Sequence, residues 1–212
     1  MSSVTVRGTA LASVTPDRAE LSLALTHLAG DAATALDEVA ERSQQLEQML
    51  TGHGFARTDW ATEGVQVAEE YQWKKDTNVL VGHRASTAVT VTIRSVDLVG
   101  KVIRDGVTGC GASIRSLNWR VDADNPARRQ LLGEAARDAR VRAAAYAEAL
   151  GLRLGEVELI SELEPAVAPE APVARQAMMM AKAGGDMMAE VSVSGGLVEL
   201  NANVYVRFAT LS

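Results

Sequence analysis

The feature that most constrains the fold is a long helical pattern between Asn125 and Gly155. Asn125 is a favourable N-cap, and Pro126 suits the first helical position, where a missing backbone N–H is no loss. Apolar residues then recur at steps of three and four, which predicts one buried helix face. That face consists of Leu132, Ala135, Ala136, Ala139, Ala143, Tyr146, Ala147 and Leu150. Because most of it is alanine, the helix is expected to lie close to a sheet or a second helix, and Gly151 is expected to end it in the left-handed conformation.

The composition is that of a globular protein with an aliphatic core. The chain has 212 residues, 47% of them hydrophobic, so it is long enough to bury a substantial core. Only 4% are aromatic, which leaves Val, Leu, Ile and Ala to build that core. The formal net charge is -6, and the basic residues form only short pairs. No nucleic-acid partner is therefore expected, because phosphate binding needs a concentrated basic surface.

Two further patterns concern membranes and the cellular compartment. The sequence has no run of about 18 apolar residues, so no integral membrane segment is predicted. The N-terminal residues lack the basic segment followed by an apolar one that marks a secretory signal. As written, the sequence predicts a cytoplasmic protein, and it predicts a periplasmic or envelope protein if the N-terminus has been trimmed.

The N-terminal third alternates between strand and helix patterns. Residues 3–14 and 19–27 read as strands, and the turn residues between them predict a hairpin. Gly8 marks a bulge or a close approach within the first strand. Residues 31–51 then read as a helix capped by Asp31. Its expected core stripe is Leu36, Val39, Ala40, Ser43, Leu46 and Leu50.

The remaining elements complete an α+β pattern. Residues 59–73 and 79–94 predict an antiparallel strand pair, and a short helix from Ser95 is expected to close at Gly106. Further strands are expected at about 113–122, around Val157 to Ile160, and at 198–208, where the alternation is clearest. The sequence thus predicts one domain over residues 1–212, with antiparallel or mixed sheets and helices packed on one face.

Residues 163–196 form a Pro/Ala/Met-rich excursion from that domain and are expected to be flexible. Its methionines are Met178, Met179, Met180, Met187 and Met188. The favoured interpretation is an arm that packs on a neighbouring subunit, since methionine adapts to irregular surfaces. Two alternatives are a disordered segment, and a Cu(I) or oxidant site, because thioethers are soft ligands and are readily oxidised.

No group of residues predicts catalysis. His27, His53 and His83 lie far apart without a zinc-binding spacing, so neither a metal nor a cofactor is expected. His53 is expected in the loop after the first helix, and His83 at the surface before a strand. Cys110 lies between two glycines and reads as a small residue in a connection.

The carboxylates likewise fall into ordinary roles. Glu69 and Glu70 beside Tyr71, and Asp122 and Asp124 before the long helix, are expected to be solvated charges or helix caps. No catalytic residue is predicted, and the chain is not expected to be an enzyme.

Four motifs in order resemble the SIMPL-domain family. They are VRGTALASVTPDRA at 6–19, GHRA at 82–85 before an alternating strand, the alanine-rich helix running into ALGLRLGEV at 149–157, and a variable Pro-rich segment before a last strand. His83 stands where an aromatic residue commonly follows the glycine.

The resemblance implies a function without assigning a site. Many bacterial members of the family are periplasmic or envelope proteins, some are linked to oxidative-stress defence, and one assembles into a ring or channel-like oligomer. The family has no agreed catalytic residues. We therefore expect a non-enzymatic, self-assembling homo-oligomer linked to stress defence or the cell envelope. The alternative is a stress protein that binds a small molecule or Cu(I) through the Met-rich segment.

Overall fold

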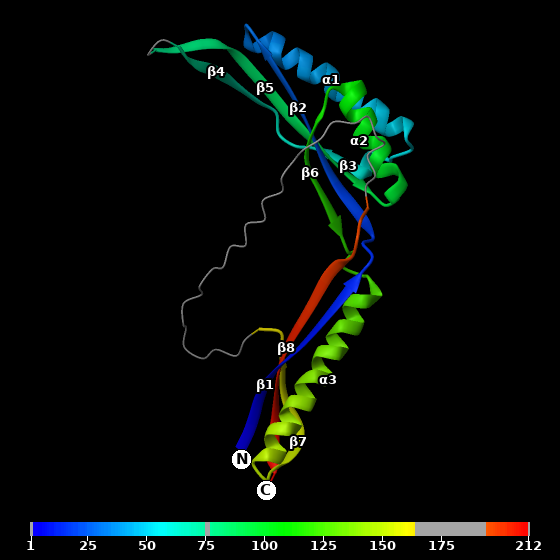
Figure 1. The fold of residues 1–212 in the computed structure, drawn as a ribbon, viewed down its shortest axis with the longest axis vertical. Coiled ribbons are helices and arrows are strands. Elements are labelled where there is room, and N and C mark those ends of the chain that lie inside the picture. The colour runs from blue at the N-terminus through cyan, green and yellow to red at the C-terminus, as the bar shows by residue number, and fades with distance from the viewer. Residues whose placement is uncertain (1, 75–76, 164–193, 212) are drawn as a thin grey trace. The chain divides into compact units, whose positions relative to one another are not determined.

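The computed structural model describes residues 2–74, 77–163 and 194–211, and it divides the chain into two compact units, each with its own sheet (Figure 1). The first unit contains β1 (Ser2–Val14), α3 (Pro126–Ala149), β7 (Arg153–Ser161) and β8 (Val198–Leu211). The second contains β2 (Arg18–Ala29), α1 (Ala32–Gly52), a short 3-10 helix (Arg57–Asp59), β3 (Trp60–Thr62), β4 (Gln66–Lys74), β5 (Thr77–Ile93), α2 (Val96–Cys110) and β6 (Ser113–Arg120). The predicted α+β class is confirmed, and the single predicted domain has two separate sheets within it.

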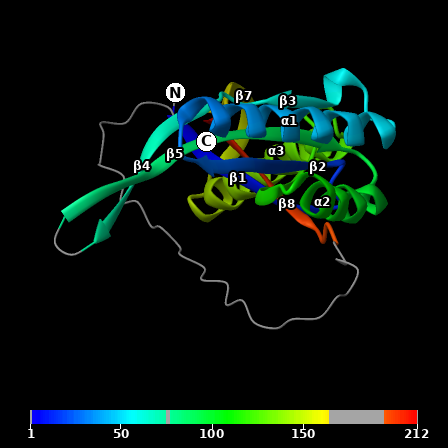
Figure 2. The same cartoon turned by 90° about the horizontal axis from the view of Figure 1, so that it is seen from above.

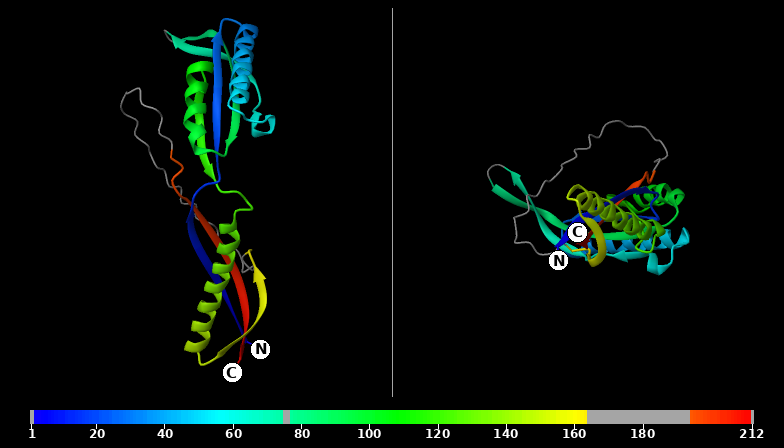
Figure 3. Two further views of the ribbon diagram at one scale, coloured as in Figure 1. Left: turned by 90° about the vertical axis from the view of Figure 1, so that its right-hand side faces the viewer. Right: turned by 90° about the horizontal axis from the view of Figure 1, so that it is seen from below.

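In the first unit, α3 lies along a three-stranded sheet in the order β1-β8-β7 (Figure 3). Asn125 accepts a hydrogen bond from the backbone N–H of Ala127 at 2.9 Å, and Gly151 follows the helix with φ 68°, so both predicted ends are confirmed. On β8 the predicted alternation holds. Its buried residues are Leu200, Ala202, Val204, Val206 and Phe208.

The buried face of α3 is narrower than predicted. The buried residues of α3 are spaced four positions apart and form one row: Leu131, Ala135, Ala139, Ala143 and Ala147. Leu132, Ala136, Tyr146 and Leu150 are exposed, so their assignment to the core is wrong. A helix can pack through a single ridge formed by residues four positions apart. Residues beside that ridge are then exposed to solvent.

Gly8 of β1 lies directly against the backbone of α3. A Cβ atom added to Gly8 would lie 2.0 Å from the carbonyl oxygen of Ala135 and 2.7 Å from the Cβ of Ala139. The backbone N–H of Thr9 donates to the carboxylate of Asp138 at 2.8 Å, and this hydrogen bond holds the pKa of Asp138 below its usual value. The predicted close approach at Gly8 is confirmed, and the alanine row of α3 is what permits it.

The second unit is built on an antiparallel sheet in the order β3-β5-β2-β6, with β4 also paired to β5. The predicted antiparallel pairing of 59–73 with 79–94 is confirmed, with a break between β3 and β4. The hairpin predicted between 3–14 and 19–27 is wrong, because β1 belongs to the other sheet and β2 pairs with β5 and β6. Turn residues show where a strand ends, but they do not show which sheet the next strand joins.

Helices α1 and α2 lie side by side on one face of this sheet (Figure 2; Figure 3, left). The core between them and the sheet is aliphatic, as the composition predicts. Its fully buried large side chains are Leu21, Leu23, Leu25, Val39, Leu46, Leu50, Val89, Val91, Ile93, Val99 and Val102. Asp31 caps α1 as predicted, by accepting from the backbone N–H of Thr34 at 2.9 Å. Leu36 and Ala40 are exposed, so their predicted place in the core stripe is wrong.

Helix α2 extends one turn beyond its predicted end at Gly106. Gly106 is buried within the helix, where its missing side chain leaves room for Leu23, whose Cδ1 atom would lie 3.1 Å from an added Cβ. Gly111, with φ 65°, ends the helix in the left-handed conformation. Cys110 is therefore the buried last residue of a helix and not part of a connection.

Candidate functional site

The second unit carries an exposed apolar surface on the two strands β4 and β5. We name the pair β4 and Thr77–Arg84 of β5 the apolar ribbon. Its end near Lys74 and Thr77 extends away from both helices (Figures 1 and 2). Its large exposed apolar side chains are Val67, Tyr71, Trp73, Val79, Leu80 and Val81. Trp73 has 69% of its surface exposed, so the ribbon offers a large apolar area that nothing in the described chain covers.

A bulge lies within the ribbon at Gly82, where the buried part of β5 begins. Glu70 pairs with Gly82 and Tyr71 pairs with Leu80, so Val81 is an extra residue on β5. Gly82 has φ 149°, and an added Cβ would lie 2.3 Å from the carbonyl oxygen of Ala29. Because a bulge bends its strand and increases its twist, the residues before Gly82 leave the face that packs on the helices.

The polar residues of the ribbon form exposed pairs. Arg84 donates to the Glu70 carboxylate at 3.0 Å, which lowers the pKa of Glu70, and the Tyr71 hydroxyl donates to Glu69 at 2.5 Å, which raises the pKa of Tyr71. The prediction that Glu69 and Glu70 are solvated charges agrees with this geometry. Neither carboxylate lies in a buried pair of the kind that acid–base catalysis requires.

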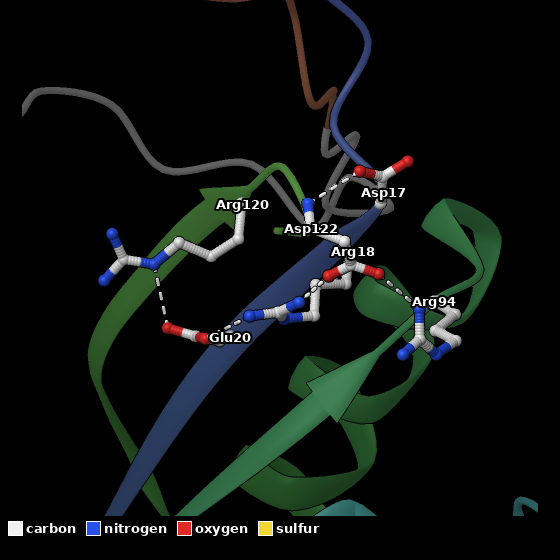
Figure 4. Close-up of polar contacts among 6 residues, drawn as sticks. All are labelled: Asp17, Arg18, Glu20, Arg94, Arg120 and Asp122. Carbon is white, nitrogen blue, oxygen red and sulfur yellow. Dashed lines mark hydrogen bonds and ion pairs between the residues drawn. The ribbon is translucent and has the colours of Figure 1, made fainter. Parts of the chain in front are cut away.

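Asp122 has a more specific role than the solvated charge or cap that its sequence position predicts. Its carboxylate forms ion pairs with Arg18 and with Arg94, the latter at 2.9 Å, at the end of the second unit's sheet (Figure 4). Its backbone N–H donates to the carboxylate of Asp17 at 2.7 Å, so the segment after β6 is held against the start of β2.

Glu20 extends the same ion-pair group (Figure 4). Its carboxylate binds Arg120 at 2.9 Å and Arg18 at 3.4 Å. The hydrogen bond from Arg120 is the main cause that holds the pKa of Glu20 below its usual value of 4.5. With three carboxylates and three guanidinium groups, the group balances its own charge, and its role is to fasten the ends of β2 and β6.

The lowered pKa of Glu20 predicts a pH dependence of stability. A carboxylate whose pKa is lower in the folded state contributes stability above its unfolded pKa, and that contribution is lost as the pH falls through the folded value. We expect Glu20→Gln to remove a contribution of no more than about 1 kcal/mol, since the pair is partly exposed. Melting temperatures of both proteins between pH 7 and pH 3 test this. The melting curves of the wild-type protein and of Glu20→Gln should converge below about pH 4. The control Asp37→Asn, on the exposed side of α1, should not produce this pH-dependent difference from the wild-type protein. A constant difference in melting temperature at all pH values would contradict the stabilising role of the Glu20 carboxylate.

The three histidines lie on different elements. His53 follows α1, as predicted, and its Nε2 lies 2.8 Å from the carboxylate of Asp105 on α2. His27 lies on β2. His83 is a half-buried residue within β5, and its Nδ1 is buried without a hydrogen-bond partner among the described residues, so its predicted place before a strand is wrong.

The described residues contain no group of three or more His, Cys, Asp or Glu side chains that could hold a metal ion. The five candidate methionines, Met178 to Met180, Met187 and Met188, lie outside the described residues. Burial raises the pKa of the Cys110 thiol, which disfavours the reactive thiolate. In the parts of the chain that the structure describes, no helix is long and apolar enough to cross a membrane.

The fold defines an α+β protein with two sheets, and its family follows from comparison of sequences. The chain belongs to the SIMPL family, described as proteins of unknown function (DUF541), whose sequence model matches residues 4–208. This confirms the resemblance seen in the motifs, and the match spans both units.

The chain is similar in sequence to two kinds of bacterial protein. The chain is 28% identical to the 26 kDa periplasmic immunogenic protein of Brucella melitensis over 215 residues, which cover 97% of this chain and 83% of that protein. It is 30% identical to the uncharacterized protein YggE of Escherichia coli over 119 residues, which cover 56% of this chain and 48% of that protein.

Proposed function

We propose that this SIMPL-family protein is a non-enzymatic, self-assembling protein whose apolar ribbon binds a second copy of the chain. The observation that carries the proposal is the exposure of six large apolar side chains on a two-stranded ribbon. Tyr71, Trp73 and Leu80 share one face of the ribbon, because Tyr71 pairs with Leu80, whereas Val79 pairs with Gln72 on the other face. Exposed apolar patches mark interaction surfaces, and burying them is favourable by about 25 cal/mol for each Å² removed from water. A two-stranded ribbon is only marginally stable by itself, so covering it would also stabilise its strands.

The surface of the second copy that best matches the ribbon is strand β7. This strand lies at an edge of the first unit's sheet, and it exposes Val157, Leu159 and Ile160. An open strand edge accepts a further strand, and apolar side chains beside it add contact area. Because the ribbon and β7 are different surfaces, each copy would bind two neighbours, and such a contact closes into a ring or extends as a filament.

The cellular setting that we propose is the cell envelope. The word "periplasmic" in the name of the Brucella melitensis relative supports this compartment over the cytoplasmic alternative. A role in stress defence rests on the family resemblance. The Pro/Ala/Met-rich arm predicted to assist assembly lies outside the described residues, and the proposal does not depend on it.

Light scattering after size-exclusion chromatography tests the assembly. We expect the wild-type protein to form a discrete oligomer, and we expect both the ribbon variant Tyr71→Ser/Trp73→Ser/Leu80→Ser and the edge variant Val157→Ser/Ile160→Ser to be monomeric. Mixing the two variants should give one-to-one heterodimers, because one intact ribbon and one intact edge remain in the mixture.

A matched control is Val141→Ser, which removes an apolar side chain that is 68% exposed on α3 and should leave the mass unchanged. A monomeric wild-type protein, or a ribbon variant that keeps the wild-type mass, would reject the proposal. Variants that lose mass but fail to form heterodimers would reject β7 as the partner surface and retain the ribbon.

Binding of Cu(I) by the Met-rich segment remains a prediction from sequence. The residues that would carry it are not among those described, and no observation on the described residues favours it over assembly.

A further inference from the structure

The face of the second unit's sheet opposite the helices is polar and is made of small residues. The cross-strand pairs Glu20–Thr92, Ser22–Thr90, Ala24–Ala88 and Thr26–Ser86 of β2 and β5 lie on it, beside Ser116 and Asn118 of β6. The alternate residues of β2 face the helices and form the core. Because these small side chains project only a short way from the sheet, longer side chains from its edges can extend across this face.

Two such side chains, Glu63 and Arg115, meet over this face. The Arg115 guanidinium donates through Nη1 to the Glu63 carboxylate at 2.6 Å. Glu63 lies between β3 and β4 at one side of the sheet, and Arg115 lies on β6 at the other, with β5 and β2 between them. The ion pair therefore bridges two intervening strands and stands over Ala24 and Ala88, which line the hollow beside it.

Irregularities in the sheet place both residues there. Ser22 pairs with Ser116 and Leu23 pairs with Ile114, so Arg115 is the extra residue of a bulge. Bulges redirect side chains and are frequent beside functional sites. Glu63 occupies the break between β3 and β4.

Glu63 is held in place before any ligand arrives. Its backbone N–H donates to the carbonyl of Ala88 at 2.7 Å, and its own carbonyl accepts from the Thr87 hydroxyl at 3.2 Å. The Thr90 hydroxyl donates to the carboxylate at 2.9 Å. One acceptor oxygen is thus directed by Thr90 and the other by Arg115, which fixes the carboxylate over the sheet.

A hollow lies on each side of the ion pair. One has a volume of about 340 Å³, and the other has a volume of about 330 Å³. The first is lined by Glu20, Ser22, Glu63, Thr90, Arg115, Ser116 and Asn118. At its floor Ser22 has 6% of its surface exposed, and its buried hydroxyl has no hydrogen-bond partner among the described residues. A buried hydroxyl without a partner is costly, so a ligand or water is expected to bind it.

We propose that this face binds a small zwitterion, a free amino acid or a dipeptide, whose ammonium group pairs with Glu63 and whose carboxylate pairs with Arg115. Glu63 is negatively charged and Arg115 is positively charged. A ligand with one positive and one negative group therefore pairs with both residues at once. An anion alone would compete with Glu63, which is fixed, and a cation alone would leave Arg115 without its partner. Arg115 has five N–H donors, and Glu63 takes one of them, so donors remain for a carboxylate.

The lining fits a small and polar ligand. Ser22, Ser116 and Asn118 supply a hydroxyl, a second hydroxyl and an amide for the polar groups of an amino acid or a peptide bond. The hollows are too small for a folded partner and lack an aromatic platform. This site does not involve the apolar ribbon, so its success or failure is separate from that of the assembly proposal.

Titration calorimetry of the full-length protein with L-glutamine and with glycylglycine tests the site. We expect both probes to bind, and we expect N-acetylation or C-terminal amidation of either probe to weaken its binding by at least about tenfold, because each modification removes one charge-assisted hydrogen bond. Glu63→Gln and Arg115→Gln should each weaken binding to a similar extent, and Ser22→Ala should weaken it less. Arg84→Gln, which breaks the exposed ion pair with Glu70 on the ribbon, should leave the affinity unchanged.

The capped probes act on the wild-type protein, so the proposal stays testable if a variant folds poorly. Absence of binding by both probes at millimolar concentration would overturn it. Equal affinity for a probe and its N-acetylated form would also overturn it, because the site would then recognise only an anion.

Discussion

Replacing Gly8 with alanine is expected to destabilise the first unit by at least about 3 kcal/mol, at the upper end of overpacking effects. The added Cβ would lie 2.0 Å from a backbone oxygen of α3, and a backbone atom cannot move aside as a side-chain end can. Either β1 or α3 must shift, and the packing of Val6 and the hydrogen bond from Thr9 to Asp138 would be lost with that shift.

The distribution of tryptophan makes this effect measurable unit by unit. Trp60, Trp73 and Trp119 all belong to the second unit, so their fluorescence reports its unfolding, whereas far-ultraviolet circular dichroism reports both units. In urea, Gly8→Ala should lose part of its circular dichroism at a lower concentration than the wild-type protein, with the fluorescence transition unchanged.

Gly133→Ala is the matched control in the same unit. Gly133 lies within α3, and an added Cβ would meet only the end of the Arg137 side chain, at 3.7 Å. Alanine is favoured over glycine in a helix by roughly 0.5–1 kcal/mol, so this variant should be more stable than the wild-type protein. If the two variants behaved alike, the close contact between Gly8 and α3 would be refuted.

The second large effect is expected in the core beneath α1. Leu46→Ala should cost roughly 2–5 kcal/mol of the second unit's stability, the range for large-to-small substitutions at buried leucines. Leu46 is fully buried, whereas Leu36 on the same helix has 39% of its surface exposed. Leu36→Ala should therefore cost less than about 1 kcal/mol.

Urea unfolding followed by tryptophan fluorescence compares these two variants directly. Both remove the same atoms from the same helix, so differences in helix propensity cancel. Equal destabilisation would show that both leucines share one buried face, as the sequence predicts, and would contradict the observed burial of α1.

Local sequence patterns predict the positions of helices and strands better than they predict which strands pair. The N-cap at Asn125, the end of α3 at Gly151 and the alternation of β8 depend on neighbours in sequence, and all three were predicted. The pairing of β2 depends on residues 54–74 positions away on β5 and 89–102 positions away on β6, and the turn after β1 contains no signal for it. The phase of α1 and α3 was wrong at Leu36 and Leu132 because an apolar residue at a margin satisfies the helical period without facing the sheet.

The candidate surfaces were harder to predict for a related reason. Tyr71 and Trp73 lie on a correctly predicted strand, but their exposure reflects a strand with no covering element among the described residues, and the sequence does not reveal which strands the helices cover. Glu63 and Arg115 are 52 positions apart, and two irregularities in the sheet bring them together. No spacing rule describes such a pair, so the sequence pattern does not reveal it.

The strand order β1-β8-β7 has a consequence for synthesis on the ribosome. The central strand of the first sheet, β8, is the last described strand to be made, whereas the described strands and helices of the second unit are complete by Arg120. The second unit can therefore fold before β8 is synthesised. Until then β1, α3 and β7 lack the central strand of their sheet, and their apolar faces are exposed to water. During that interval the nascent chain is most exposed to aggregation and to capture by chaperones.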